Sequence, residues 1–438
     1  MKNTNRRDFL KTSAVVAGGA LLGALDVGRF AHAAESNTIK LGLVGCGGRG
    51  TGAAGDAMIG NPDTKLCAVA DVFADKAETA VKTLTGKFGK QVEVPQDRQF
   101  TGLNGYRGVI ENCDVVFIAC SSRFHPQYAL EAVKAKKHVF VEKPAGVDVA
   151  GVCTVLEAEA LAKKNGTGVL AGVTYRYHLG RREAVKRMQA GEIGEILAIQ
   201  SDYLRAPYGL HDRKPEWSEM EYQFRNWYHF SWLSGDDIPQ SLIHNLDSAL
   251  WATGDVMPEA AYGMGGRSTH FQTSMGTSFD HQHVTYEFAS GLCIYASCRT
   301  AAGCFNSNKD IYHGTKGRCY YASMGAPYFT DLKGNVIWRA DAELSKKSPY
   351  QQEHNEFLQS IRAGKPLHGA KVLADSTMVT VLGQLSAYNG KRITWKEAMD
   401  SKFAFPPQGE ITMNMEPPVK PGADGVYPVA IPGQTKLL

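Results

Sequence analysis

Hydrophobic and polar residues follow two different patterns along this 438-residue chain. Between residues 37 and 151, short and wholly apolar runs such as LGLVG, CAVA and VVFIAC alternate with stretches in which apolar residues recur at helical spacing. Buried apolar strands that alternate with helices are typical of a parallel sheet covered on both faces. We therefore predict a doubly wound α/β domain of the Rossmann type over residues 36–160.

The pattern changes near residue 167, where apolar and polar residues alternate along longer runs. The runs HVTYEF and LCIYASC flank Ser290-Gly291 and predict an antiparallel hairpin. We predict an α+β domain with an open, largely antiparallel sheet over residues 161–400. Residues 205–240 are rich in aromatic residues, His and Arg without periodicity, which is typical of loops that line a site. A tail rich in Pro and Gly, residues 401–438, is expected to be extended.

The first 34 residues have the pattern of an export signal. Arg6-Arg7 precedes an apolar stretch over residues 12–25, and Ala31-His32-Ala33 follows as a cleavage candidate. The arginine pair resembles the twin-arginine signal, although Asn5 stands where Ser or Thr is usual. The stretch is too short to span a bilayer. We expect the twin-arginine export machinery as a partner, a periplasmic or otherwise exported product, and no membrane attachment after processing.

The sequence gives no support for nucleic-acid binding or for a zinc site. The net charge is +4, and no basic stripe interleaved with aromatic residues is present, so nucleic acid is not an expected partner. His281 and His283 share one face of a predicted strand, but a zinc site needs at least one further ligand. No metal site is predicted.

The segment GCGGRG, residues 45–50, is a G-x-G-x-x-G motif between a predicted strand and a predicted helix. In that context the glycines allow a tight turn, a close approach to a pyrophosphate and helix–strand packing. An acid at the end of the next strand, Asp71, suits the ribose hydroxyls and repels a 2′-phosphate, so NAD is favoured over NADP. Arg49 softens that preference. The predicted cofactor contacts here are Gly45, Gly47, Gly48, Arg49, Gly50 and Asp71.

Glu142-Lys143-Pro144 ends the apolar run HVFVEKP. Ligands of open α/β sheets lie outside the carboxyl ends of the strands, so Lys143 is expected to point into the cleft. Desolvation there lowers the pKa of a lysine and makes it a suitable proton carrier. The alternative is a solvated lysine at the end of a strand.

These features together resemble the glucose–fructose oxidoreductase / inositol dehydrogenase / rhizopine catabolism (Gfo/Idh/MocA) family. The similarity rests on the glycine motif, Asp71, the run SSRFHPQYALEAVKAKKHVFVEKP and the later sheet domain, and covers nearly all of the mature chain. It implies a two-domain NAD(P)-dependent oxidoreductase of sugars, cyclitols or their derivatives, and a homo-oligomer formed through the open sheet. It also implies a catalytic Lys143 and a His125 beside the nicotinamide. Further cofactor contacts that it implies are Cys120, Ser121, Ser122 and Glu142.

The family's second signature is an Asp, a His four residues later and an acid three residues beyond. The segment GDDIPQSLIHNLDS supplies His244 and Asp247, but Gln240 stands at the position of the first acid. These three residues share one face of a helix, and His244 is the expected base. Asp236 and Asp237 are alternative sources of the missing carboxylate, and the sequence does not choose between them.

Aromatic side chains stack on the apolar faces of sugar rings, and several here are equally suited to a core. The expected substrate contacts are Tyr175, Arg176, Trp227, Tyr228, His229, Gln240 and Asp247. The leading hypothesis is an exported NAD-dependent oxidoreductase of a secondary hydroxyl, with NAD held tightly because no free pool exists outside the cytoplasm. A redox-neutral glycosidase that oxidises, eliminates, hydrates and reduces is one alternative. A non-catalytic nucleotide-bound binding protein is another, and the presence of Lys143 and His244 counts against it.

Overall fold

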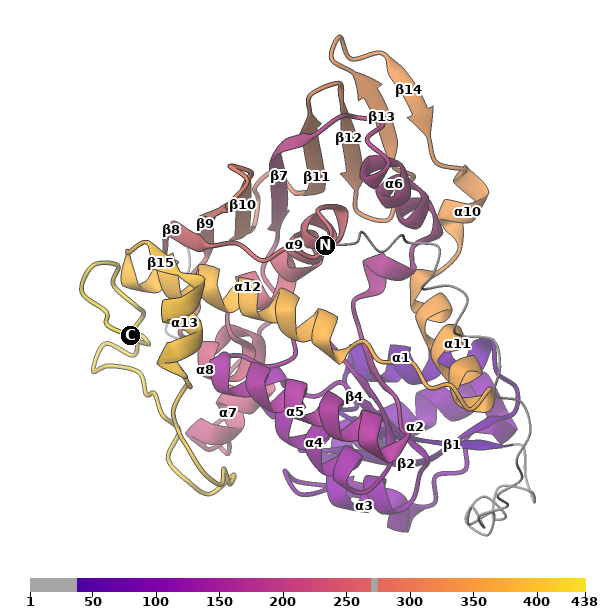
Figure 1. Ribbon diagram of the computed structural model, residues 1–438. Helices are drawn as coiled ribbons and strands as arrows, with labels where there is room; N and C mark the ends of the chain where they lie inside the picture. The colour runs from indigo at the N-terminus through magenta and orange to yellow at the C-terminus, as the bar shows by residue number, and fades with distance from the viewer. Residues whose placement is uncertain (1–37, 269–274) are drawn as a thin grey trace, which may run out of the picture. The chain divides into compact units, whose positions relative to one another are not determined.

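A parallel sheet forms the centre of the first half of the chain (Figure 1). The computed structural model describes residues 38–268 and 275–438, so the predicted signal lies outside the described residues. Within that part of the chain the sheet has six strands in the order β3-β2-β1-β4-β5-β6. The strands are β1 (Ile39–Val44), β2 (Thr64–Asp71), β3 (Gln99–Thr101), β4 (Val115–Ile118), β5 (His138–Val141) and β6 (Val169–Ala171). This order confirms the predicted Rossmann fold.

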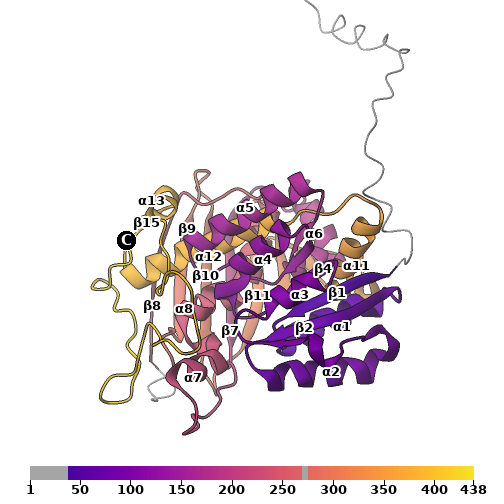
Figure 2. The same ribbon diagram turned by 90° about the horizontal axis from the view of Figure 1, so that it is seen from below.

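Helices cover both faces of this sheet. They are α1 (Gly48–Ile59), α2 (Ala74–Phe88), α3 (Tyr106–Glu111), α4 (His125–Lys134) and α5 (Val149–Asn165). Side chains of α1 and α2 pack in one apolar cluster, and those of α3, α4 and α5 pack in another on the opposite face (Figure 2). Both faces are therefore buried, which is why the strands read as continuous apolar runs.

The second sheet is mixed and larger. Among the described residues it has nine strands in the order β14-β13-β12-β11-β7-β10-β9-β8-β15. They are β7 (Ile196–Arg205), β8 (Ala260–Gly266), β9 (His281–Glu287), β10 (Cys293–Thr300), β11 (Ser307–Gly314), β12 (Gly317–Ala322), β13 (Tyr328–Asp331), β14 (Val336–Arg339) and β15 (Ile393–Thr394). β9 and β10 form the predicted hairpin, and the pair β7–β10 is parallel while the other pairs are antiparallel. The predicted open, largely antiparallel sheet is confirmed.

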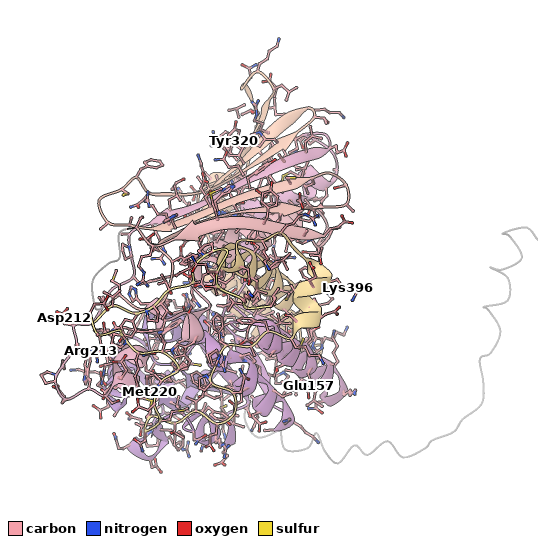
Figure 3. All side chains as sticks on the ribbon, turned by 90° about the vertical axis from the view of Figure 1, so that its left-hand side faces the viewer. Glu157, Asp212, Arg213, Met220, Tyr320 and Lys396 are labelled. Carbon is pink, nitrogen blue, oxygen red and sulfur yellow. The ribbon has the colours of Figure 1, made fainter. Side chains whose placement is uncertain are left out.

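Helices cover one face of this second sheet. The helices of the second half are α6 (Leu179–Gln189), α7 (Glu219–Arg225), α8 (Ser231–Ser234), α9 (Ile243–Ala252), α10 (Ala342–Lys346), α11 (Pro349–Arg362), α12 (Ala370–Asn389) and α13 (Trp395–Ser401), with short turns at Thr174–Tyr177, Trp227–His229 and Ile238–Leu242. Side chains of α6, α9 and α12 share one apolar cluster with the sheet. Tyr320 lies on the face turned away from these helices (Figure 3). The second sheet is therefore covered by helices on one face and open on the other.

The predicted boundary at residue 160 needs correction, because the two halves interpenetrate in sequence. Residue 160 lies inside α5, and β6 still pairs with β5 in the parallel sheet. Moreover, Phe357 and Leu358 of α11 pack with the strands of the first sheet, far from them in the chain. Figure 1 shows α12 running between the two sheets. Residues 39–438 accordingly form one compact unit.

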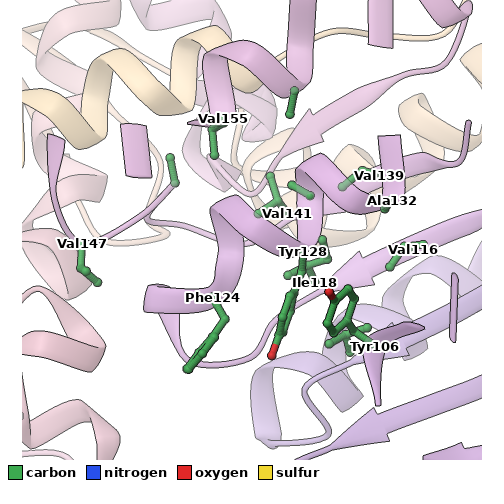
Figure 4. Packing of buried hydrophobic residues seen from close by; sticks show 14 of the residues in the cluster. Tyr106, Val116, Ile118, Phe124, Tyr128, Ala132, Val139, Val141, Val147 and Val155 are labelled. Carbon is green, nitrogen blue, oxygen red and sulfur yellow. The ribbon is translucent and has the colours of Figure 1, made fainter. Parts of the chain in front are cut away.

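Aromatic rings close the first core beside the carboxyl ends of its strands (Figure 4). Tyr106 and Tyr128 are stacked with ring centroids 4.1 Å apart, and Phe124 lies 5.6 Å from Tyr128. Burial of one such ring contributes about 2 kcal/mol to stability. These rings also form the base of the crevice described below.

The tail beyond Ser401 has no helix or strand in its described residues, yet it is anchored at several points. Arg123 donates to the carbonyl oxygen of Phe405 at 2.8 Å, and Gln223 of α7 donates to that of Val419 at 2.7 Å. Tyr427 is buried. The tail is thus extended, but it is part of the packed structure.

Candidate active site

The turn from β1 into α1 forms one wall of a crevice. Gly45 has φ +94°, and a Cβ there would lie 2.4 Å from the backbone nitrogen of Cys120. A Cβ on Gly50 would lie 1.9 Å from the carbonyl oxygen of Gly45. A Cβ on Gly47 or Gly48 would meet nothing within 4 Å. The fold therefore requires glycine at positions 45 and 50. Gly47 and Gly48 instead leave open space at the N-terminus of α1, where free N–H groups favour a phosphate.

Asp71 lies at the carboxyl end of β2 beside this turn. Its Oδ2 accepts from the backbone N–H of Cys46 at 2.7 Å, and its Oδ1 accepts from that of Phe73 at 3.0 Å. Burial raises the pKa of Asp71, and the two N–H groups oppose that rise. Each oxygen keeps a second lone pair for a ribose hydroxyl. The open glycines and this carboxylate therefore fit a nicotinamide dinucleotide.

The second half of the chain supplies the opposite wall of this crevice, through residues 205–230, which we call the cover. A cavity of about 290 Å³ lies between the turn and the cover. Trp227, Tyr228 and Tyr208 form a stack, with ring centroids 3.8 and 3.9 Å apart. The guanidinium of Arg225 lies 3.9 Å from the ring centroid of Phe73. The structure thus places Trp227 and Tyr228, expected as sugar contacts, in the wall of the nucleotide crevice.

The loop after β4 is fixed by polar contacts with α8 and with the segment that follows β5. Ser121 donates to the carbonyl oxygen of Leu233 in α8 at 3.0 Å. The His125 ring lies between the carbonyl oxygens of Pro144, at 2.8 Å, and Cys120, at 3.0 Å. Burial lowers the pKa of His125 to about 4. His125 therefore holds the loop against the residues around Lys143, and Cys120 and Ser121 line the crevice.

Arg49 and Glu142 contact each other. The Nε of Arg49 lies 3.1 Å from Oε1 of Glu142, and its Nη2 lies 3.3 Å from Oδ2 of Asp56. The guanidinium also lies 4.6 Å from the ring centroid of Tyr350 in α11. Both predicted cofactor contacts thus belong to one charge-compensated group at the edge of the crevice.

Lys143 follows β5 and extends toward the second half. Its Nζ donates to the backbone carbonyl oxygen of Gln240 at 2.5 Å. The side chain is half-buried, and burial lowers its pKa to about 8. Lys143 therefore carries a proton at neutral pH but gives it up readily, as a proton carrier requires.

His244 lies near Lys143 at the start of α9. Its ring is half-buried and lies 5.1 Å from the ring of Tyr175. Burial lowers its pKa well below the usual value, and the charges of Lys143 and Arg181 add to this. The imidazole is therefore a free base at neutral pH, beside an ammonium group.

The remaining parts of the second signature do not converge on the site as expected. Asp247 is buried and accepts from Nε of Arg176 at 3.0 Å and from Ser376 at 2.8 Å. The Gln240 amide donates to Oγ of Ser122 at 2.8 Å. The expectation assumed α-helical spacing, but Ile238–Leu242 is π-helical and changes the direction of side chains before α9. Gln240, Asp247 and Arg176 thus all have partners within the protein. Their role as substrate contacts stays a prediction.

Tyr175 and His229 also have packing roles. The hydroxyl of Tyr175 accepts from Asn308 at 3.1 Å, and the Arg181 guanidinium lies 3.8 Å from the centre of its ring. His229 is buried, with Nε2 3.4 Å from the carbonyl oxygen of Gly209. Tyr175 packs against the ring of His244, and His229 contacts the backbone of the cover at Gly209.

Comparison with protein families agrees with this geometry. The model described as "Oxidoreductase family, NAD-binding Rossmann fold" matches residues 39–171, and the GFO/IDH/MocA C-terminal domain matches residues 182–320. The chain belongs to the Gfo/Idh/MocA family. A third model, for the twin-arginine translocation signal, matches residues 3–23. The chain therefore carries both an export signal and the two domains of this oxidoreductase family.

Known members of the Gfo/Idh/MocA family are similar to the chain to different extents. The 2,7-anhydro-N-acetylneuraminate hydratase of Escherichia coli is 29% identical over 47% of this chain, and the match spans 50% of that enzyme. The inositol 2-dehydrogenase of Salmonella paratyphi B is 28% identical over 76% of this chain and 88% of that enzyme. The aldose-aldose oxidoreductase structure from Caulobacter crescentus has a TM-score of 0.63 and 20% identity, over 82% of this chain and 100% of that one. The last similarity concerns the fold alone.

The histidine pair on β9 has other partners. Nδ1 of His281 lies 2.6 Å from Asp280, and that of His283 lies 3.0 Å from Oγ of Ser297. In residues 38–268 and 275–438 no group of three or more His, Cys, Asp or Glu is arranged to hold a metal. Each helix in those ranges is too short or too polar to span a bilayer.

Sequence reasoning missed several residues around Lys143 and His244. Arg205 lies 3.5 Å above the ring of Tyr208 and 2.7 Å from Oδ1 of Asp237. The buried Arg181 lies behind Tyr175 and His244. The only signal for Arg205 and Tyr208 was the aromatic and polar composition of residues 205–240, whereas Asp237 was one of the two acids that the sequence left open.

Proposed function

We propose that this chain is an exported NAD-dependent oxidoreductase that acts on a secondary hydroxyl of a sugar, cyclitol or glycoside. The supporting observation is that Lys143, held on the carbonyl oxygen of Gln240, and His244, held against Tyr175, lie near a crevice that fits the dinucleotide. Burial lowers the pKa of both groups, which favours a proton carrier and a neutral base. The family and its inositol dehydrogenase relative support the substrate class.

The two side chains have complementary tasks in this proposal. NAD, when bound, accepts a hydride from a carbon and returns it in the reverse direction. The neutral imidazole of His244 takes the hydroxyl proton. The ammonium group of Lys143 donates a hydrogen bond to the same oxygen and stabilises its developing negative charge. Both protonation states coexist at neutral pH, because the pKa of His244 lies well below 6.5 and that of Lys143 is about 8.

We further propose that the cover retains the cofactor through export. Arg225 lies over Phe73, pairs with Glu221 at 2.8 Å, and lies 3.6 Å from Asp75 of α2. The tail supports α7 from the other side, since Tyr427 donates to Glu219 and contacts α7 beside the Gln223–Val419 bond. A retained cofactor must be regenerated in place, as is required where no free NAD is supplied.

The proposal also includes self-association through the open face of the second sheet. Tyr262 and Met264 of β8 and Tyr295 of β10 lie on either side of β9, with 45%, 68% and 43% of their surface exposed. Exposed apolar groups of this size on a sheet face favour an interface. Sedimentation of the wild-type protein and of Met264→Lys tests this part, which predicts a smaller particle for the variant.

A redox-neutral activity is the second candidate, because a relative that is 29% identical is named as a hydratase. Such an enzyme oxidises a ring carbon, eliminates or adds a group across the activated bond, and then reduces the carbon again. It uses the same Lys143 and His244, but consumes no external acceptor.

One experiment separates these functions. The protein is purified after export, the nucleotide released from it is identified by mass, and sugars, cyclitols and glycosides are added without an acceptor. Stoichiometric NAD and a keto product support the oxidoreductase, whereas hydrolysis or hydration with unchanged NAD supports the second candidate. Bound NAD without turnover of any of these compounds indicates a binding protein, and protein that binds no NAD contradicts the proposal.

A further inference from the structure

Asp237 is a buried carboxylate at the start of the π-helical segment. Only 7% of its surface is exposed. Its Oδ1 accepts from Arg205 at 2.7 Å and from Ser241 at 2.7 Å. Its Oδ2 has no hydrogen-bond donor among the described residues, although the thiol of Cys298, a weak donor, lies beside the carboxylate. Burying a carboxylate oxygen without a strong donor lowers the stability of the folded state, so a group of this kind is a candidate for a functional role.

The neighbouring Asp236 has a different role. Its Oδ2 accepts from the backbone N–H of Phe279 at 2.9 Å and from the hydroxyl of Tyr388 at 2.5 Å. It is fully buried and has φ +76°. Asp236 therefore anchors the chain to α12 and to the segment before β9, and both of its carboxylate oxygens accept hydrogen bonds within the protein. Of the two acids that the sequence left open, only Asp237 has an oxygen whose one neighbouring donor among the described residues is a weak one, the Cys298 thiol.

Asp237 lies close to the group that holds Lys143. Gln240, whose carbonyl oxygen accepts from the lysine Nζ, follows Asp237 by three residues. Asp237, Gln240 and Arg205 line the same small cavity, together with Tyr208. The Gln240 amide is neutral and donates away from the lysine, to Ser122. The carbonyl oxygen thus orients the ammonium group but does not compensate its charge.

A partly buried ammonium group needs a compensating charge nearby. The charged or titratable groups that act on Lys143 are Glu142, Arg205, Asp237, Arg49 and His244. Glu142 is already paired with Arg49. Arg205 is positive and lies within the same cavity wall. If Asp237 lost its charge, Arg205 would face Lys143 uncompensated.

We propose that Asp237 is the positioning carboxylate of Lys143: paired with Arg205, it keeps the ammonium group protonated and in place, which the amide at position 240 cannot do. This inference rests on the catalytic role that the proposed function gives to Lys143. It assigns to Asp237 the counter-charge that the second signature lacks at position 240.

The test measures the protonation of Lys143 without using a sugar. The NAD-loaded protein is acylated briefly with acetic anhydride at a series of pH values, and the modification of Lys143 is followed by peptide mass spectrometry. We expect a midpoint at a pH of about 8 for the wild type. For Asp237→Asn we expect a midpoint about one pH unit lower, because an opposite charge has been removed. Asp202→Asn is the matched control: it removes a carboxylate from the same strand as Arg205, where the partner is Lys309 at 3.7 Å.

A second readout applies when a substrate is known. The alkaline limb of the pH profile of turnover should move with the Lys143 midpoint in Asp237→Asn, while the acidic limb stays in place. A merely structural role would lower turnover at all pH values without moving the limb. Asp237→Glu, which keeps the charge, should bring the Lys143 midpoint and the alkaline limb most of the way back to their wild-type positions.

The outcomes are distinct. An unchanged Lys143 midpoint in Asp237→Asn, or an equal shift in Asp202→Asn, overturns the inference whether or not sugars are turned over. A lowered midpoint in a protein that oxidises no sugar supports the coupling and counts against the proposed function instead. If Asp237→Asn fails to fold, Asp237→Ser removes the same charge with a smaller side chain, and the same shift is expected.

Discussion

The cofactor side of the candidate site consists mainly of backbone groups, and the catalytic side consists of side chains. On the cofactor side, glycines, backbone N–H groups and one carboxylate within residues 45–71 form the surface that fits the dinucleotide. On the catalytic side, single side chains come from β5, β7, the π-helical segment and α9, and each is held by contacts with distant parts of the chain. A backbone site is local in sequence and depends on the absence of side chains. A side-chain site depends on packing across both halves of the molecule.

This difference predicts that substitutions will fail in different ways. On the cofactor side, the space around an added methyl group should decide whether folding or NAD binding is lost. On the catalytic side, removing a charge should lower turnover where the group faces the substrate, and stability where the group contacts another element.

The largest effect is expected at the glycines. Gly50→Ala should prevent folding, because its Cβ would lie 1.9 Å from the carbonyl oxygen of Gly45. Gly48→Ala should fold with an unchanged melting temperature but lose NAD, since its Cβ enters only the open space above α1. Gly52→Ala, where the nearest atom is a flexible Arg49 nitrogen at 3.6 Å, is the control and should keep both properties. Soluble yield, thermal melting and bound nucleotide measure these effects, and wild-type NAD content in Gly48→Ala would place the pyrophosphate elsewhere.

The next largest effect is expected at Lys143 and His244. Lys143→Met and His244→Gln should each lower turnover by about 10³-fold with NAD content unchanged, because proton transfer is lost while the crevice is intact. Wild-type turnover should fall above a pH of about 8, where Lys143 loses its proton. Absorbance of the reduced cofactor after addition of substrate measures both.

Asp247→Asn sharpens the contrast within the same signature. It removes the buried carboxylate and leaves the half-buried Arg176 with one carboxylate, that of Asp255. The free energy of unfolding should therefore fall by about 3 kcal/mol. Turnover per folded molecule should remain close to that of the wild type. A loss of turnover without a loss of stability would show that Asp247 takes part in substrate binding or catalysis.

These contrasts also explain what the sequence revealed. The glycine motif, Asp71 and Lys143 were predictable because each follows directly from the end of a strand, and the strand pattern locates those ends. The position of Gln240 relative to His244 could not be predicted, because the π-helical segment changes the helical phase and no periodicity indicates it. The contacts of Arg176 with Asp247 and Asp255 join separate parts of the chain and were likewise not predictable. Arg205 and Asp237 meet through tertiary packing between β7 and a segment 32 residues later. The domain boundary failed for a related reason, since α11 returns to the first sheet.

A smaller effect is expected from the cover. Arg225→Met keeps the stem of the side chain but removes its charge over Phe73 and beside Asp75. Release of NAD should become about five- to tenfold faster, in line with about 1 kcal/mol for a cation–π contact. Arg339→Met removes a similar contact, 4.5 Å from the ring of Tyr328, on the far edge of the second sheet. Transfer of NAD to an excess of a fluorescent acceptor protein measures the rate, and equal rates in all three proteins would mean that the cover does not retain the cofactor.

The smallest effect tests how α11 joins the first sheet. His354 is fully buried against Phe117 and Phe140, and neither ring nitrogen has a hydrogen-bond partner among the described residues. Burial lowers its pKa to about 3. Below pH 6.5 the unfolded chain binds a proton at this position and the folded chain does not, so stability is lost as the pH falls.

His354→Leu should remove that loss. Between pH 8 and pH 5.5 the wild-type protein should lose about 1.4 kcal/mol more stability than the variant, which corresponds to one pH unit below the unfolded pKa. Phe357→Leu on the same helix is the control: it weakens the same core at both pH values without titrating. Urea unfolding at the two pH values measures the difference. An equal pH dependence in wild type and His354→Leu would show that the imidazole shares a proton with Glu353, whose Oε1 lies 4.0 Å from Nε2, and that α11 docks through a polar contact.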